Sequence, residues 1–172
     1  TLGTFSGDCD FDFSTGEFWL NGGSNSVPYL QKLQHDGSLV WAKQLASGVD
    51  TLIIERDVNR AGDSWTLGRF TGVIDINPGP GVFSLDAANG ALFVLKLDTD
   101  GNFAWARQFN LGNGFWAKPA ADDQGNIWLC SSFSGTVDAD PGPDVFFINP
   151  EPFVSNNMAI IKLDTAGNLH WA

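Results

Sequence analysis

Two acidic loops carry the residues best suited to bind a cation. Residues 75–81 read DINPGPG and residues 138–144 read DADPGPD. In each loop two oxygen-bearing side chains stand at positions i and i+2 directly after a strand-like run, where extended backbone points both side chains the same way. Calcium prefers oxygen ligands of this kind. With their counterparts in residues 8–12, the candidate calcium ligands are Asp75, Asn77, Asp138, Asp140, Asp10 and Asp12.

A second interpretation of these loops needs no metal. Asp and Asn side chains accept hydrogen bonds from backbone N–H groups nearby, and proline presets φ in such a turn. The spacing is neither that of an EF-hand nor that of a glycine-rich calcium repeat, and the sequence does not identify the remaining ligands. Turn capping and calcium binding therefore both stay open.

Three lysines recur among apolar residues, at Lys32, Lys96 and Lys162. A buried ammonium group must be paired or lose its charge. We expect each lysine to form an ion pair with an acidic loop, because three equivalent sites suit a structural role better than catalysis.

Local catalytic motifs are absent from the sequence. The only histidines are His35 and His170, and no Gly-x-Ser-x-Gly, His-Glu-x-x-His or phosphate-binding motif occurs. A long-range carboxylate pair for glycoside cleavage would leave no local pattern. The sequence favours a non-enzymatic protein.

The seven tryptophans fall into two groups. Five hold repeated positions and are expected to pack between structural units: Trp41, Trp65, Trp105, Trp128 and Trp171. Trp19 and Trp116 do not recur. Packing is the first expectation for both, because large aromatic side chains are mostly buried. Exposed, either could stack on the face of a sugar, so both are candidate glycan-binding residues.

Composition narrows the class of protein. The chain has 172 residues, with 20 glycines and 14 phenylalanines, which favours short strands and tight turns. Its net charge of −11 argues against nucleic-acid binding, which needs a basic surface. No apolar run approaches the roughly 18 residues of a membrane span, so membrane insertion is not expected. Cys9 and Cys130 occupy non-equivalent positions and are expected to be buried thiols rather than a disulfide.

An internal repeat of about 64 residues organises the chain. The segments LQHDGSLVWA (33–42), LDTDGNFAWA (97–106) and LDTAGNLHWA (163–172) align without gaps, and a Phe-Ser/Thr-Gly triplet recurs upstream of each. The predicted units are residues 1–48, 49–112 and 113–172, which together form one partial domain.

Each unit is predicted to contain four antiparallel strands. In the second unit these are residues 64–70, 81–86, 92–98 and 103–109, and an Asp-Gly turn at 98–102 joins the last two. No stretch has helical periodicity. Four-stranded units of this length predict an all-β fold of β-propeller blades rather than an immunoglobulin-like array, whose units are longer.

The chain resembles the SBBP-type β-propeller repeats of bacterial secreted and cell-surface proteins. The resemblance is carried by FSGTVDADPGPDVFFI (133–148), FTGVIDINPGPGVFSL (70–85), the KLD strand end and the GNxxWA hairpin. The first unit, FSGDCDFDFSTGEFWL (5–20), departs by losing Pro-Gly-Pro. The resemblance implies a propeller fold and an extracellular or cell-surface location.

A propeller usually closes with about four to eight blades, and only three units are visible here. The expected partners are therefore further blades of a longer protein or copies of this chain. The leading hypothesis is a non-enzymatic scaffold for assembly, adhesion or protein interaction, with calcium stabilising the loops. The alternatives are a glycan-binding module and the propeller segment of a larger secreted enzyme.

Overall fold

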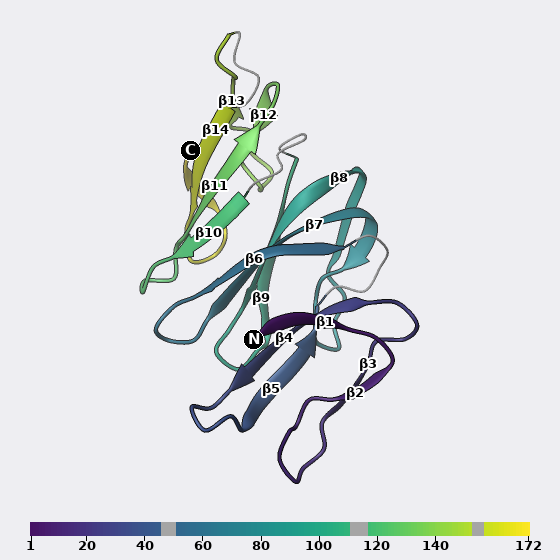
Figure 1. The fold of residues 1–172 in the computed structure, drawn as a ribbon. Helices are drawn as coiled ribbons and strands as arrows, with labels where there is room; N and C mark the ends of the chain where they lie inside the picture. Colours follow the sequence, from purple (N-terminus) through teal and green to yellow (C-terminus); the bar gives the residue numbers. More distant parts are fainter. Residues whose placement is uncertain (46–50, 111–116, 153–156) are drawn as a thin grey trace.

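The computed structural model describes residues 1–45, 51–110, 117–152 and 157–172 (Figure 1). Every regular element in these ranges is a β-strand, and every strand pairing is antiparallel, which confirms the all-β prediction. Within them, no helix has the length and apolarity to cross a bilayer.

The strands form three main sheets that follow one another along the chain, drawn in purple, teal and green to yellow (Figure 1). The first sheet, in the order β1-β4-β5, contains β1 (Leu2–Phe5), β4 (Val27–Leu33) and β5 (Leu39–Gln44). The second, in the order β6-β7-β8-β9, contains β6 (Leu52–Val58), β7 (Ser64–Asp75), β8 (Ser84–Leu97) and β9 (Phe103–Phe109). The third, in the order β10-β11-β14-β15, contains β10 (Ala117–Ala121), β11 (Ile127–Phe133), β14 (Asn157–Leu163) and β15 (Leu169–Trp171).

Two small ribbons extend the outer sheets toward the acidic loops. β2 (Asp8–Asp10) pairs with β3 (Trp19–Asn21), and β12 (Val137–Asp138) pairs with β13 (Phe147–Ile148). In the second sheet the long strands β7 and β8 continue into the equivalent ribbon, where Asp75 pairs with Ser84. The acidic loop therefore closes the same kind of hairpin in each repeat.

The core lies between the sheets. One cluster joins a face of the first sheet, including Leu30 and Trp41, to Phe70 and Phe93 of the second. The other joins the opposite face of the second sheet, including Trp65 and Val94, to the third. Because successive side chains of a strand point to opposite faces of the sheet, neighbouring residues belong to different clusters. The second sheet is consequently buried on both faces.

The strand prediction for the second repeat was partly wrong. The sequence pattern predicts two strands, at 81–86 and 92–98, but the single strand β8 covers parts of both, because its pairing with β7 resumes after the register shift between Phe70 and Gly72. The edge strands β6 and β10 were not predicted. β6 carries Glu55, Arg56 and Asp57 in succession, which breaks the alternation of a half-buried strand.

The Asp-Gly hairpin turn at 98–102 is confirmed. At 98–102 the carboxylate of Asp98 accepts hydrogen bonds from the backbone N–H groups of Asp100 and Asn102, at 2.9 and 2.8 Å. The turns at 122–126 and 164–168 repeat this arrangement. The turns at 98–102 and 164–168 contact the sheet of the preceding repeat.

Candidate functional site

The acidic loop of the second repeat is closed by its own side chains. One carboxylate oxygen of Asp75 accepts hydrogen bonds from the backbone N–H groups of Asn77 (3.1 Å) and Phe83 (3.0 Å). The side-chain oxygen of Asn77 accepts another from the N–H of Gly79 at 2.8 Å. These contacts are those of the turn-capping interpretation.

The third repeat builds the same loop. Asp138 accepts hydrogen bonds from the N–H groups of Asp140 (3.0 Å) and Phe146 (2.9 Å), and Asp140 accepts one from Gly142 at 2.7 Å. Each donor stands at the same separation from its acceptor as in the second repeat.

The first repeat keeps this geometry without Pro-Gly-Pro. Asp10 accepts hydrogen bonds from the N–H groups of Asp12 (3.0 Å) and Phe18 (2.9 Å), and Asp12 accepts one from Ser14 at 2.9 Å. Hydrogen bonding by the side chain and backbone of Ser14 lowers the pKa of Asp12. An aspartate followed two positions later by Asp or Asn, rather than the prolines, is thus the shared determinant of the loop.

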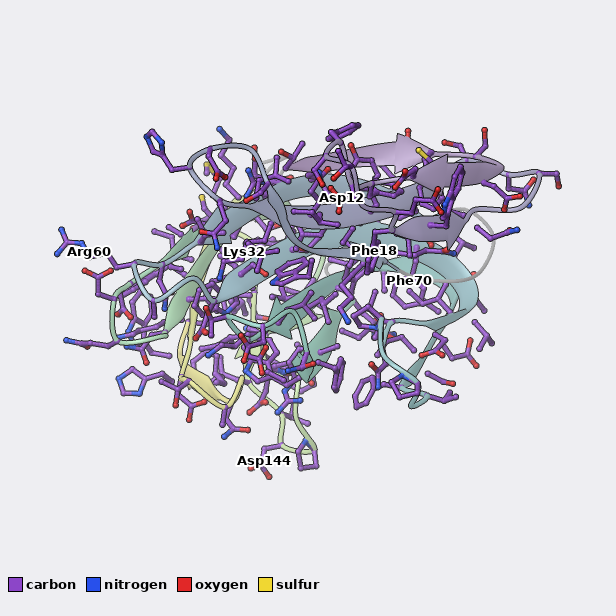
Figure 2. The ribbon with its side chains drawn as sticks, turned by 90° about the horizontal axis from the view of Figure 1, so that it is seen from below. Asp12, Phe18, Lys32, Arg60, Phe70 and Asp144 are labelled. Atoms are coloured by element: carbon purple, nitrogen blue, oxygen red, sulfur yellow. The ribbon has the colours of Figure 1, made fainter. Side chains whose placement is uncertain are left out.

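The acidic loops do not converge on one site. Figure 2 shows Asp12 of the first loop and Asp144 of the third on opposite sides of the molecule. In the ranges that the structure covers, no three His, Cys, Asp or Glu side chains are grouped so that they could hold a metal ion. Calcium binding by these loops stays a prediction, whereas the capping contacts are observed.

A tryptophan connects each sheet to the turn of the next repeat. The indole N–H of Trp41 donates to the backbone oxygen of Thr99 at 3.3 Å. Trp105, its equivalent in the second repeat, donates to the backbone oxygen of Thr165 at 2.9 Å. Both indoles are buried, at 8 and 7% exposure. The same contact therefore forms at both interfaces between sheets.

A glycine in each turn lies against the tryptophan ring. A Cβ atom on Gly101 would fall 2.8 Å from ring atoms of Trp41, and one on Gly167 would fall 2.8 Å from Trp105. Both glycines have positive φ, at 77° and 78°, which L-residues with a Cβ rarely adopt. Conformation and contact together require glycine at this point of the turn.

Among the described residues, no turn covers the equivalent tryptophan of the third repeat. Trp171 is 42% exposed. Met158 and Ile160 lie on the same strand face and are 73 and 52% exposed, whereas their equivalents Leu92 and Val94 in the second sheet are 5 and 0% exposed. We call Trp171, Met158 and Ile160 the open face.

The three lysines differ in their partners. Lys96 forms the predicted ion pair, with its Nζ 3.4 Å from a carboxylate oxygen of Asp63, and it also lies 4.9 Å above the centre of the Trp65 ring. The ion-pair prediction is wrong for Lys32, whose Nζ donates to the backbone and side-chain oxygens of Thr99 at 2.7 and 3.0 Å. Lys162 lies 4.5 Å above the ring of Trp128.

Two further polar contacts between repeats were not predicted. The guanidinium of Arg107 donates to the backbone oxygens of Gly167 (2.8 Å) and Ala166 (2.9 Å). The carboxylate of Asp57 accepts a hydrogen bond from the backbone N–H of Ala121 at 2.7 Å. Their partners are backbone atoms, so no pattern of paired side chains marks these contacts in the sequence.

The packing expectation for Trp19 is wrong. Its side chain is 58% exposed, and its indole N–H lies 3.3 Å from a carboxylate oxygen of Glu17. The loop register aligns it with Phe147, which is 65% exposed, so an aromatic side chain does recur here. Trp116, the other glycan candidate, lies outside the described residues.

The cysteines form no disulfide. Cys9 and Cys130 are both free thiols, and both are half-buried rather than fully buried as expected. Cys130 shares the strand face that includes Met158 and Ile160 through its pairing with Ile160.

Comparison with known proteins gives no match: no family model, no curated protein and no solved structure matches this chain. Its function must therefore be inferred from its own residues.

Proposed function

We propose that this chain is a non-enzymatic, extracellular or cell-surface scaffold of the SBBP β-propeller type, and that it works by stacking repeats face to face. Each of the three sheets would be one blade. Two sheet-to-sheet interfaces with the same Trp–turn contact support this proposal, because a contact that forms twice within the chain can form again when a further repeat is added.

The observation that carries the proposal is the contrast among three equivalent tryptophans. Trp41 and Trp105 are covered by the turn of the following repeat, and Trp171 is 42% exposed. Exposed apolar side chains gathered on one sheet face are typical of an interaction surface. The open face therefore suits another sheet of the same type, supplied by further blades or by a second copy of this chain.

The acidic loops would form a rigid surface that a partner can bind. Internal hydrogen bonds hold each acidic loop in one conformation, so a partner would meet a largely preformed surface. Calcium bound to the remaining oxygen atoms would strengthen the loops further, and it is part of the proposal on the sequence pattern alone.

Sedimentation velocity of the purified chain over a wide concentration range tests the stacking proposal. We expect concentration-dependent association that Trp171→Ala removes. Trp19→Ala deletes an equally large exposed side chain away from the open face and should leave association unchanged. A parent chain that stays monomeric at every concentration, or equal association of both variants, would contradict the proposal.

A second candidate function is glycan binding through Trp19. The exposure of its ring, with the Glu17 carboxylate beside the indole N–H, favours this alternative, since exposed aromatic faces stack on sugars. A glycan array followed by tryptophan fluorescence titration tests it. Saturable quenching that Trp19→Ala removes is expected, and an array without signal would exclude this function.

A further inference from the structure

A polar cleft of about 480 Å³ lies in the second repeat, where β8 extends beyond the last residue that pairs it with β9. Residues 86–90 of β8 line it on one side, and Gln108 and Asn110 line it from the end of β9. Small-molecule sites in proteins typically measure roughly 300–1,000 Å³. The cleft therefore has room for a small ligand.

A β-bulge forms one wall of this cleft. Phe70 of β7 pairs with Ala91 and Gly72 pairs with Ala87, so residues 88–90 of β8 leave the regular ladder. Gly90 adopts a φ of 82° within this bulge. Bulges are over-represented next to binding and active sites, where they redirect side chains. Here the bulge lies directly beside the polar end of β9.

The ribbon position of Asp86 is polar in all three repeats, and in the other two its side chain is paired. Asn21, the equivalent residue in the first repeat, donates from Nδ2 to a carboxylate oxygen of Asp8 at 2.6 Å. In the third repeat, Asn149 accepts a hydrogen bond from the hydroxyl of Thr136 at 3.0 Å. In both cases the partner comes from the facing strand of the ribbon.

Asp86 lacks this partner. The residue opposite it on β7 is Val73, which is 60% exposed and offers no hydrogen-bonding group in its side chain. Within the described ranges, no other group pairs with the Asp86 carboxylate. The second repeat thus keeps a polar side chain at this position without the contact that gives it a structural role, and this side chain lines the cleft.

The remaining polar groups of the wall include both donors and acceptors. Gln108 Nε2 donates to the backbone oxygen of Asp86 at 2.9 Å and to Asn110 Oδ1 at 3.3 Å. These two bonds use both hydrogens of the Gln108 amide and leave Gln108 Oε1 and Asn110 Nδ2 available. The side-chain amide of Asn89 has no partner among the described residues. The wall therefore offers a carboxylate and amide oxygens as acceptors, together with amide N–H donors.

This mixture distinguishes between classes of ligand. A metal ion needs only acceptors and an anion needs only donors, whereas a hydroxyl group both donates and accepts. A single carboxylate also falls short of the several oxygen ligands that calcium takes. Neutral molecules that carry several hydroxyl groups match the wall best.

We propose that this cleft binds a neutral hexopyranose, with the Asp86 carboxylate accepting hydrogen bonds from the sugar hydroxyls and the amides of Asn89 and Asn110 completing the contacts. The hydrogen bond from Gln108 to the backbone of Asp86 holds the bulge against the end of β9, so the site is largely formed before the sugar binds. This site adds a recognition role to the proposed scaffold, and it uses neither Trp19 nor the open face.

NMR titration of the ¹⁵N-labelled intact chain with glucose, galactose and mannose tests the proposal. We expect at least one of the three sugars to shift the side-chain amide signals of Asn89, Gln108 and Asn110 saturably, with a Kd of ~1 mM or lower. Sorbitol, which carries the same kind of hydroxyl groups without a ring, should bind several-fold more weakly. A glycan array then separates the two sources of such a ring, because a site for the terminal residue of a glycan retains glycans that end in the preferred sugar, whereas a site for the free sugar retains none.

Two variants test the role of Asp86. Asp86→Ala removes the acceptor and should weaken sugar binding about tenfold or more, as expected for hydrogen bonds to a charged group. Val73→Thr supplies on β7 the hydroxyl partner that Thr136 gives to Asn149, and should weaken binding several-fold by occupying the carboxylate. This change is conservative at an exposed position, so the fold should persist.

Trp19→Ala separates this site from glycan binding through the exposed tryptophan, because it should leave the shifts at Asn89 and Gln108 unchanged. Absence of saturation with all three sugars up to ~10 mM would overturn the proposal, as would binding of sorbitol equal to that of the best sugar. Parent-like affinity of Asp86→Ala, or amide shifts that calcium produces and no sugar does, would also contradict it.

Discussion

Trp105 donates its indole N–H to the backbone oxygen of Thr165, 60 positions further along the chain, at 2.9 Å. Trp41 makes the same contact with Thr99, 58 positions away. Both acceptors are backbone oxygens in the hairpin turn of the following repeat, so the contact depends on turn geometry more than on the threonine side chain. A rigid turn and a buried aromatic ring together fix how one sheet meets the next.

The glycine of this turn is predicted to be essential where a tryptophan covers it. Gly101→Ala places a Cβ atom 2.8 Å from the Trp41 ring in a backbone with φ of 77°. Gly37→Ala is a matched control, because Gly37 has φ of 88° but its Cβ would meet no atom within 4 Å. We expect Gly101→Ala to lower the free energy of unfolding by about 1–3 kcal/mol more than Gly37→Ala, the usual cost of overpacking. Urea unfolding measures the difference, and equal losses would mean that the ring contact contributes nothing.

Equivalent tryptophans should contribute unequally to stability. Trp105 is 7% exposed and packs between two sheets, and Trp171 is 42% exposed. Trp105→Ala should lower the free energy of unfolding by about 3–5 kcal/mol, and Trp171→Ala by less than about 1 kcal/mol. Chemical denaturation at a concentration where the chain is monomeric provides the comparison. A large loss with Trp171→Ala under those conditions would show that this ring packs within its own chain.

The acidic loops should depend on hydrogen-bond acceptors more than on charge. Asp138→Ala removes the acceptor for two backbone N–H groups and should cost about 2–3 kcal/mol, whereas Asp138→Asn keeps an acceptor and should cost less than about 1 kcal/mol. Thermal melting with calcium and after chelation completes the test. A calcium-dependent rise in Tm that Asp138→Asn removes would demonstrate that the loop also holds the ion.

The sequence predicted the repeat and the class of fold, because both depend on periodic apolar positions. Recurrence of Trp41, Trp105 and Trp171 locates the contact surfaces, and the Asp-Gly pair at 100–101 locates the hairpin turn between β8 and β9. The edge strands β6 and β10 escaped detection because edge positions tolerate charged residues and Pro119, which interrupt a two-residue pattern.

Contacts to backbone atoms explain most of what was missed at the candidate site. Lys32 was expected to meet a carboxylate, and its partner is a threonine of the next repeat. No side-chain pattern marks a backbone oxygen as an acceptor. The packing expectation for Trp19 rested on the general burial of large aromatic side chains, whereas its loop position, which Phe147 takes in the third repeat, is exposed.

The hairpin turns should make stability sensitive to acid. Hydrogen bonds from the Asn126 side chain and from the backbone N–H groups of Asn126 and Gln124 lower the pKa of Asp122, although desolvation opposes them. For Asp164, partial burial acts to raise the pKa, but hydrogen bonds from Asn168 and Ala166 outweigh it, and the net pKa is lowered.

A folded-state pKa below the unfolded value of about 3.9 means that the unfolded chain binds more protons in this range. The stabilisation from these carboxylates is therefore complete above about pH 4 and is lost as the pH falls through the folded-state pKa. Urea midpoints measured between neutral and acidic pH should fall on acidification, and Asp122→Asn should make that fall shallower. Asp123→Asn removes the neighbouring charge, which lies in an exposed pair with Arg60, and should leave the acid dependence close to that of the parent. Identical acid profiles for the parent and Asp122→Asn would show that the turn carboxylate does not couple folding to protons.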